Sequence, residues 1–270
     1  MYNDYYGMKY NPFSKETVDD SGYFESGDHK EMLSRLNYLK DIRGIGIFTA
    51  RPGMGKTCSL RCFMREINRN MYTPVYICLS TVSISDFYSS ICDALGLTTS
   101  FHKSTMFKEI QERVYYLYKD RKQPLILAID EAQHLHGSIL CDLKMIMNQN
   151  YDSVNCFSLI LVGEPYLNSI IERPVHEALK QRITVHYNFT GLTEKEGPEY
   201  IFHKIEKAGG DRRIINEAAL SAVTSYSQGN ARLIDNVMTT ALTLGAQNNK
   251  AVIDADVILS AVNEQALDTE

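Results

Sequence analysis

The chain has 270 residues, of which 44% are hydrophobic and 23% are charged, and its formal net charge is −5. This length and composition suit an ordinary globular protein with one sizeable domain and a smaller one. The mildly negative charge excludes a protein coated with positive charge for non-specific nucleic-acid binding, but is compatible with a local basic strip. No apolar run could cross a bilayer, and the N-terminus lacks the pattern of a signal peptide, so we expect a cytoplasmic protein without a membrane partner. The 6 cysteines are scattered without a C-x-x-C pair, which favours reduced thiols over a disulfide or metal framework.

The expected elements alternate between helices and short apolar strands. An aromatic, turn-rich arm over residues 1–28 precedes a helix at about 29–41, which Asp28 could cap. Strands are expected at 45–48, 75–79, 125–129, 157–162 and 183–189, the last alternating as an edge strand does. The helices between them are expected from the end of the glycine-rich turn to about Asn70, from Ser85 or Asp86 to about Gly96, and at 106–119, 138–148 and, as short segments, 166–181. Near-continuous apolar strands separated by helices predict an α/β fold with a parallel sheet covered on both faces.

After about residue 190 the strand signal stops. Helices are expected at about 194–208, 216–227, 230–247 and 254–266, with breaks at glycine and asparagine positions. The predicted organisation is therefore an arm over 1–28, an α/β core over 29–190 and a helical part over 191–270.

Residues 49–57, TARPGMGKT, carry the strongest chemical signal. They lie between an apolar strand and a helix, the context that a phosphate-binding loop requires. Glycines let backbone N–H groups point at phosphate oxygens, and the positive end of the next helix faces the same anion. Ala50 stands where the usual pattern has Gly, which adds only a methyl group. Lys56 would reach the β- and γ-phosphates, and the Thr57 hydroxyl would ligate Mg²⁺. The residues expected to bind ATP are Pro52, Gly53, Met54, Gly55, Lys56, Thr57 and Cys58.

A second signal is the pair Asp130-Glu131 at the end of an apolar run. In a P-loop protein, an acid at this point holds Mg²⁺, and a following Glu can orient and deprotonate the water that attacks the γ-phosphate. Many strands end in solvated acids, so the pair indicates a catalytic site only in combination with the phosphate-binding loop upstream. Together they predict a Mg²⁺-dependent ATPase with Asp130 at the metal and Glu131 as the base.

These motifs resemble those of an AAA+ ATPase, and more narrowly of the group that includes ExeA, TnsC, TniB and MuB. The resembling pieces span nearly the whole chain: Tyr6-Gly7-Met8, Asn11-Pro12-Phe13, Phe24-Glu25-Ser26 with His29, Asp130-Glu131-Ala132-Gln133, Leu161-Val162-Gly163-Glu164-Pro165 and Gly229-Asn230-Ala231-Arg232. The resemblance implies a P-loop AAA+ parallel sheet sandwiched by helices, followed by a small all-helical lid.

The resemblance also implies catalytic roles for two arginines. Arg232 lies where the group has its sensor-2 arginine, which reaches from the lid to the γ-phosphate. Arg182 matches the arginine finger, which stabilises transition-state charge in a neighbouring subunit. Arg173 is the competing candidate for the finger, and an ordinary salt bridge is the alternative for both.

Two further positions follow from the resemblance. Glu164 occupies the sensor-1 turn, where a polar neutral residue is usual; this departs from the pattern, because a carboxylate repels a triphosphate unless a cation or a proton intervenes. Asn11, Phe13 and His29 fall where the arm of this group packs near adenine, and plain packing is the alternative for Phe13 and His29.

The resemblance implies subunits that assemble side by side, joined by ATP, as a ring or filament. TnsC- and MuB-like members do so on duplex DNA and hand target sites to a transposase, so we expect a sequence-nonspecific DNA-binding ATPase that regulates transposition. ExeA-like members assist secretion or envelope assembly and carry a membrane segment and a peptidoglycan-binding part after the AAA+ region. Neither occurs before Glu270, so this function ranks second. A helicase, suggested by residues 130–133, needs a second motor lobe and ranks last.

Two groups of residues are candidates for the DNA contact. Lys103, Ser104 and Thr105 are expected at a helix N-terminus, where N–H groups and hydroxyls meet phosphates, and Lys119 and Arg121 form a basic patch with Lys122. Solvated loops are the alternative for both. Contacts to phosphate would make binding salt-sensitive and indifferent to sequence.

Overall fold

The computed structural model describes residues 2–14, 23–79, 83–147 and 155–265. The chain divides into two compact units, which we name the sheet unit and the helical unit. The sheet unit consists of Glu31–Arg51 and Lys56–Phe189, and the helical unit combines Met1–Lys30, the turn Pro52–Gly55 and Thr190–Glu270. The expected helix ends at 148 and 266, and positions 15–22 of the arm, lie outside the described residues.

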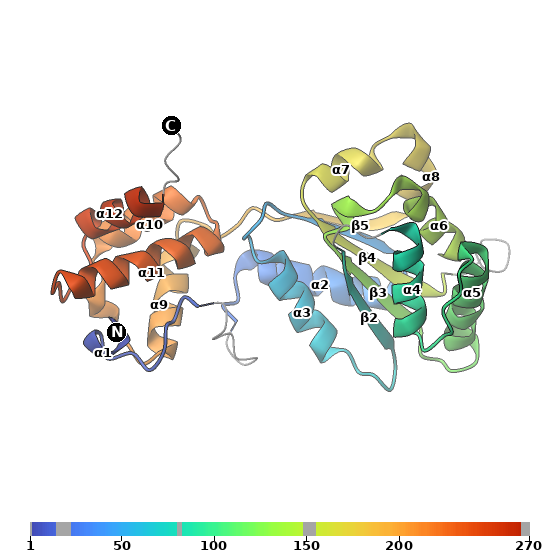
Figure 1. Ribbon diagram of the computed structural model, residues 1–270, viewed down its shortest axis with the longest axis horizontal. Helices are drawn as coiled ribbons and strands as arrows, with labels where there is room; N and C mark the ends of the chain where they lie inside the picture. The colour runs from blue at the N-terminus through green and yellow to red at the C-terminus, as the bar shows by residue number, and fades with distance from the viewer. Residues whose placement is uncertain (1, 15–22, 80–82, 148–154, 266–270) are drawn as a thin grey trace. The chain divides into compact units, whose positions relative to one another are not determined.

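The sheet unit is built on a five-stranded parallel sheet in the order β2-β3-β4-β1-β5 (Figure 1). Every position of β1, β3 and β4 is buried, which explains their uninterrupted apolar sequences. The last strand lies at an edge of the sheet and mixes buried with exposed positions, as predicted. The strands are β1 (Ile45–Thr49), β2 (Thr73–Cys78), β3 (Leu125–Asp130), β4 (Phe157–Gly163) and β5 (Ile183–Asn188).

Helices cover both faces of the sheet, which confirms the predicted α/β architecture. Ile45 and Ile47 of β1 share a core with the apolar sides of three helices, α4, α5 and α6. On the other face, the Ser158 hydroxyl of β4 donates to the Leu39 carbonyl of α2, and a Cβ on Gly46 would meet the Leu39 side chain. Figure 1 shows α2 and α3 on that side. The helices are α2 (Gly27–Ile42), α3 (Lys56–Glu66), α4 (Ile84–Ala94), α5 (Lys103–Lys119), α6 (Gly137–Met147), α7 (Tyr166–Ile171) and α8 (Glu177–Lys180).

Three of the predicted helix starts differ from the structure. Asp28 lies inside α2, which begins at Gly27, and its Oδ2 accepts the N–H groups of Thr190 and Gly191 at 2.9 and 2.8 Å. The Ser26 hydroxyl oxygen accepts the N–H of His29 instead, at 3.2 Å.

The starts of α4 and α5 also lie earlier than expected. Helix α4 begins at Ile84, with Ser83 as its N-cap in a capping box with Asp86. Helix α5 begins at Lys103, before the expected Met106. The end of α3 also differs from the prediction: the helix stops at Glu66, before the expected Asn70.

The helical unit has its own apolar core. Helices α9 (Glu196–Lys207), α10 (Glu217–Ser227), α11 (Ala231–Gln247) and α12 (Ala255–Gln265) follow one another, and the short α1 (Tyr2–Tyr5) belongs to the same unit. Tyr6, Met8 and Phe13 of the arm are buried in this core. None of the helices in the described ranges combines the length and apolar character of a membrane span.

Candidate nucleotide site

The loop after β1 has the backbone of an anion-binding turn. Gly53 and Gly55 have φ angles of +86° and +93°, which residues with a Cβ rarely adopt, and α3 begins immediately afterwards at Lys56. Ala50, which departs from the usual glycine, is buried at 2% exposure, and its N–H donates to the Gly163 carbonyl at 3.1 Å. Ala50 thus continues the pairing of β1 with β4, where a methyl group is tolerated.

The structure brings Thr57 and Asp130, the two residues predicted to hold Mg²⁺, into contact. The Thr57 hydroxyl donates to Oδ2 of Asp130 at 2.8 Å, and the Tyr76 hydroxyl donates to the same oxygen at 3.1 Å. Oδ1 of Asp130 accepts the N–H of Glu131 at 2.9 Å. Asp130 is only 1% exposed, and its partners are hydroxyl and N–H donors. Hydroxyl and carboxylate oxygens are ligands that Mg²⁺ prefers, so Thr57 and Asp130 fit a Mg²⁺–nucleotide complex.

Tyr76 was not among the predicted site residues. Burial, and then the neighbouring Asp130 carboxylate, raise the pKa of Tyr76 well above its usual value of 10.0. The phenol therefore stays protonated and donates to Asp130. Tyr76 lies on β2 and is 38% exposed. Its contact with Asp130 depends on the register between β2 and β3, which the sequence alone does not indicate.

Glu131 is held through both of its carboxylate oxygens. Its φ angle of +55° lies in the left-handed region, which is uncommon for a residue other than glycine and turns the chain sharply after β3. Oε1 lies 3.8 Å from the ammonium nitrogen of Lys56, and Oε2 accepts the Gln133 side-chain amide at 2.8 Å. The Glu131 side chain is 32% exposed, so it is accessible to solvent.

Gln133 connects Glu131 to the turn after β4. Its Oε1 accepts the N–H of Glu164 at 3.0 Å while its Nε2 donates to Glu131. A Cβ on Gly163 would lie 2.6 Å from the same Oε1, so a larger residue there would displace the Gln133 side chain. Gln133 belongs to one of the motifs named above, but the motif indicated no role for it. The structure thus links the predicted sensor-1 position to the predicted base through one side chain.

Within the helical unit, the start of α11 contacts the turn Pro52–Gly55. The Asn230 side-chain amide donates to the Pro52 carbonyl at 2.8 Å, and the N–H of Arg232 lies 3.3 Å from the Gly53 carbonyl. The Arg232 residue is exposed. Its sensor-2 role stays a prediction, and Asn230 was not predicted.

The three residues predicted near adenine all belong to the helical unit. Phe13 is 4% exposed in the core of the helical unit, with the Lys204 ammonium 5.6 Å from its ring centroid. Asn11 accepts the N–H of Phe13 at 2.9 Å. His29 is 8% exposed and stacks on Tyr23, with ring centroids 6.5 Å apart. These contacts are those of packing residues, and an adenine contact stays a prediction.

The two arginine-finger candidates both belong to the sheet unit. Arg182 is half-buried immediately before β5, and its N–H donates to the Leu179 carbonyl. Arg173 is exposed, and its guanidinium donates to the Tyr166 hydroxyl at 3.2 Å.

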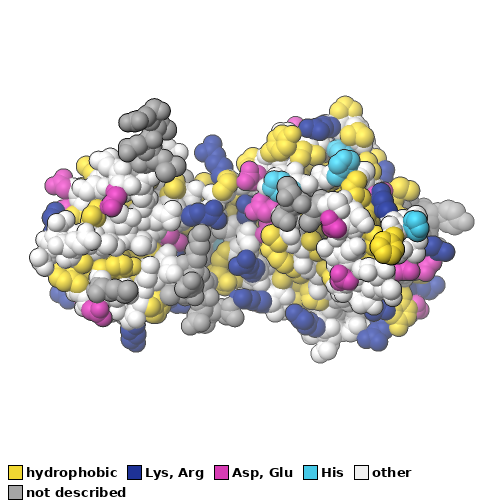
Figure 2. Space-filling view, viewed as in Figure 1, with side chains coloured by type: hydrophobic (Ala, Val, Ile, Leu, Met, Phe, Trp, Pro, Cys, Tyr) yellow, Lys and Arg dark blue, Asp and Glu magenta, His cyan; other side chains and the backbone are white. Residues whose placement is uncertain are grey.

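The predicted DNA residues lie on and just after α5. The Lys103 ammonium is 2.5 Å from an Asp142 carboxylate oxygen and 5.4 Å from the Tyr88 ring centroid, so a phosphate would have to compete with Asp142. Figure 2 shows lysine and arginine side chains singly or in small groups, interspersed with acidic and hydrophobic side chains, on the face in view. Ser104, Thr105, Lys119 and Arg121 are all exposed.

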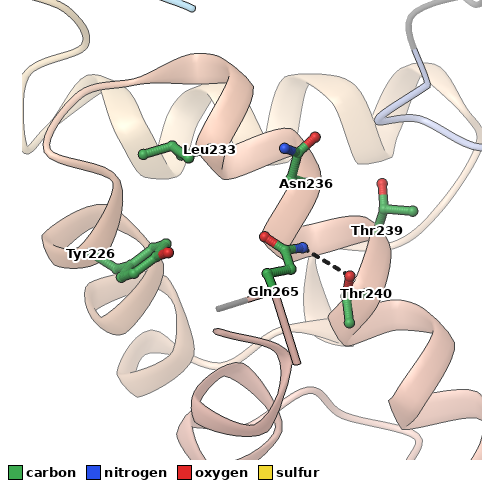
Figure 3. Close-up of a pocket in the computed structure, with 6 residues that line it drawn as sticks. All are labelled: Tyr226, Leu233, Asn236, Thr239, Thr240 and Gln265. Atoms are coloured by element: carbon green, nitrogen blue, oxygen red, sulfur yellow. Dashed lines mark hydrogen bonds between the residues drawn. The ribbon is translucent and has the colours of Figure 1, made fainter. Parts of the chain in front are cut away.

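A groove of about 490 Å³ lies between α10, α11 and α12 in the helical unit (Figure 3). The Gln265 amide donates to the Thr240 hydroxyl across it at 2.8 Å. Its lining is uncharged and includes none of the predicted site residues: Tyr226, Leu233, Asn236, Thr239, Thr240 and Gln265.

Comparisons with known proteins agree with this geometry. Residues 40–171 match the family model described as AAA domain. General secretion pathway protein A of Aeromonas hydrophila is 28% identical over 232 residues, which cover 85% of this chain but only 42% of that protein. The solved structure of Cdc6p from Pyrobaculum aerophilum aligns with a TM-score of 0.69 at 16% identity, over 94% of this chain and 70% of that one. The ORC1 protein of Aeropyrum pernix in complex with DNA aligns with a TM-score of 0.66 at 16% identity, over 94% of this chain and 68% of that one. The chain therefore has the P-loop AAA+ fold with a helical C-terminal part, and residues 40–171 are similar to an AAA domain.

Proposed function

We propose that this protein is an ATPase that binds ATP with Mg²⁺, assembles side by side on duplex DNA in the ATP-bound state, and regulates transposition by selecting target sites and recruiting a transposase. The observation that carries the chemistry is the arrangement around Glu131. One carboxylate oxygen faces Lys56, at 3.8 Å, and the other is fixed by Gln133, at 2.8 Å.

This arrangement suggests that ATP binding would free the Glu131 carboxylate from Lys56 before hydrolysis. Lys56 is 6% exposed, and in the structure its charge faces the Glu131 carboxylate. Phosphate oxygens would compete for the same ammonium group, because Lys56 is the residue that reaches the β- and γ-phosphates in such loops. Oε1 of Glu131 would then be released to accept a proton from water, while Gln133 keeps Oε2 in place.

Thr57 and Asp130 are the residues that would hold Mg²⁺. The ion would neutralise part of the triphosphate charge. Tyr76 and the backbone N–H of Glu131 keep the Asp130 carboxylate oriented through hydrogen bonds of 3.1 and 2.9 Å.

Similarity to other proteins and exposed residues of this chain both support DNA as the partner. The motifs named above resemble those of the TnsC- and MuB-like ATPases, and the ORC1 structure of similar fold is a complex with DNA. Exposed Ser104, Thr105, Lys119 and Arg121 offer a few phosphate contacts per subunit. Repeated along an assembly, weak contacts of this kind add up.

Fluorescence anisotropy on labelled duplex DNA tests the proposal, with ATP and Mg²⁺, with ADP, and without nucleotide. We expect binding only with ATP, a steep fall with added salt, and the same affinity for unrelated sequences. A double variant, Lys119→Ala with Arg121→Ala, should weaken binding and flatten the salt dependence. Lys108→Ala is a matched control, since Lys108 is an exposed lysine of α5 paired with Glu112.

A second candidate function is assistance in assembling secretion or envelope machinery. It is favoured by the 28% identity to general secretion pathway protein A over 85% of this chain. Intact ATP hydrolysis with no DNA binding in any nucleotide state would support this candidate and overturn the DNA proposal.

A further inference from the structure

The turn Pro52–Gly55 is fixed within the helical unit by one side chain, that of Asn230. Its Nδ2 donates to the Pro52 carbonyl at 2.8 Å. Its Oδ1 accepts the N–H groups of Arg232 and Leu233 at 3.0 and 3.3 Å, as the N-cap of α11. The same amide therefore caps a helix and holds the loop, with a different atom for each task.

This contact sets the direction of the loop's N–H groups. A trans peptide unit directs its C=O and its N–H to opposite sides. The Pro52 carbonyl points at Asn230, so the Gly53 N–H in the same peptide unit points away from α11. The Gly53 carbonyl faces the N–H of Arg232, so the Met54 N–H also points away. No protein group within the described ranges accepts a hydrogen bond from the N–H of Gly53 or Met54, which leaves both donors available for an anion.

The position of Asn230 is itself fixed by its surroundings. The carbonyl of the preceding Gly229 accepts the N–H of Leu192 at 2.9 Å. A Cβ on Gly191 would lie 2.6 Å from both that carbonyl and the Met54 sulfur, so the segments pack without spare room. A Cβ on Gly53 would collide with the Asn230 side-chain oxygen. Asn230 therefore has little freedom to give up the Pro52 contact.

We propose that Asn230 is a positioning residue for ATP binding, which holds the P-loop turn so that the N–H groups of Gly53 and Met54 face the phosphates. The inference rests on ATP binding at this loop. It assigns to α11 a second function beside the one expected for Arg232.

The variant Asn230→Asp separates the two tasks of the side chain. Aspartate caps a helix as well as asparagine does, but it has no amide to donate to Pro52. Asn216→Asp is the matched control, because Asn216 caps α10 through the N–H of Ala219, at 2.9 Å. Asn230→Ser removes the Pro52 contact without adding a charge and keeps a capping oxygen.

The measurements are the Kd for mant-ATP with Mg²⁺, the steady-state KM and kcat, and Tm. We expect Asn230→Asp and Asn230→Ser to raise the Kd and KM about three- to ten-fold, the range for one lost hydrogen bond, with kcat at saturation and Tm close to those of Asn216→Asp. If Asn230 had a purely structural role, its variants would have a lower Tm and an unchanged Kd. Wild-type affinity in Asn230→Ser would overturn the proposal, even if Asn230→Asp were weakened, because charge alone would then be the cause.

Lys56→Ala separates this inference from the assignment of the ATP site. Loss of mant-ATP binding in Lys56→Ala with wild-type binding in both Asn230 variants overturns only the role of Asn230. Wild-type binding in all three variants overturns the site and the inference together.

Discussion

Gln133→Ala tests whether the orientation of Glu131 limits hydrolysis. The substitution removes the 2.8 Å hydrogen bond to Oε2 of Glu131 and the acceptor of the Glu164 N–H. A hydrogen bond to a charged group contributes about 1.5–3 kcal/mol. Because the Glu131 side chain is 32% exposed, water replaces part of this, and about 1–2 kcal/mol remains for orienting the base. This corresponds to a fall in kcat of roughly five- to thirty-fold.

Steady-state ATP hydrolysis is the assay, with kcat and KM determined separately. KM should stay within about two-fold of wild type, because the lost contact orients the base and is not expected to touch the phosphates. Gln133→Glu keeps the length of the side chain but cannot donate, and it sets a second carboxylate against Glu131, so its kcat should fall at least as far. Gln123→Ala is the control, since the Gln123 amide donates to the Asn70 carbonyl at 2.9 Å and should leave kcat unchanged. A wild-type kcat in Gln133→Ala, or a loss confined to KM, would refute the reasoning.

Three further predictions concern the loop, the finger and the helical unit. Lys56→Ala should abolish ATP binding in a mant-ATP titration, and unchanged affinity would remove Lys56 from the site. Arg182→Ala should bind ATP normally but lose at least ten-fold of the assembly-stimulated hydrolysis, as expected for a group that acts in trans; full stimulated activity would exclude it as the finger. Burial favours the protonated form of Glu196, but the hydrogen bonds from Thr193 and Gly27 outweigh it and lower the pKa below its usual 4.5. Glu196→Gln should therefore lower stability by about 1 kcal/mol at neutral pH, with the difference disappearing as the pH falls below 4.5, and an effect independent of pH in thermal unfolding would contradict this.

The parts of the fold that sequence predicted are those set by local pattern. The strand before the loop, the glycines with positive φ and the helix from Lys56 form one continuous stretch, so residue types alone define them. The same holds for β3 and the acids that follow it. The contact of Thr57 with Asp130 agrees with the motif chemistry, in which both positions serve the same ion in P-loop proteins.

The parts that sequence did not predict depend on partners far along the chain. Asp28 looked like a helix cap, but its Oδ2 accepts two N–H groups more than 160 positions away. Lys103 looked like a phosphate ligand, but its charge is paired with Asp142 on another helix. Gln133 and Asn230 stood inside recognised motifs without roles, because their hydrogen bonds reach the turn after β4 and the Pro52 carbonyl. The S-x-x-D pattern of Ser83 and Asp86, in contrast, was a local signal that could have located the start of α4.

The most direct test of the account is the lifetime of complexes between Glu131→Gln protein and duplex DNA. This variant keeps the Lys56 and Thr57 groups for ATP but loses the base, so the account predicts a protein that binds ATP, fails to hydrolyse it and stays assembled on DNA. Wild-type complexes should dissociate as ATP is consumed, and both proteins should release DNA when ADP replaces ATP. Equal lifetimes for the two proteins in ATP, or DNA binding that is the same in ATP and ADP, would contradict the claim that the nucleotide state controls assembly.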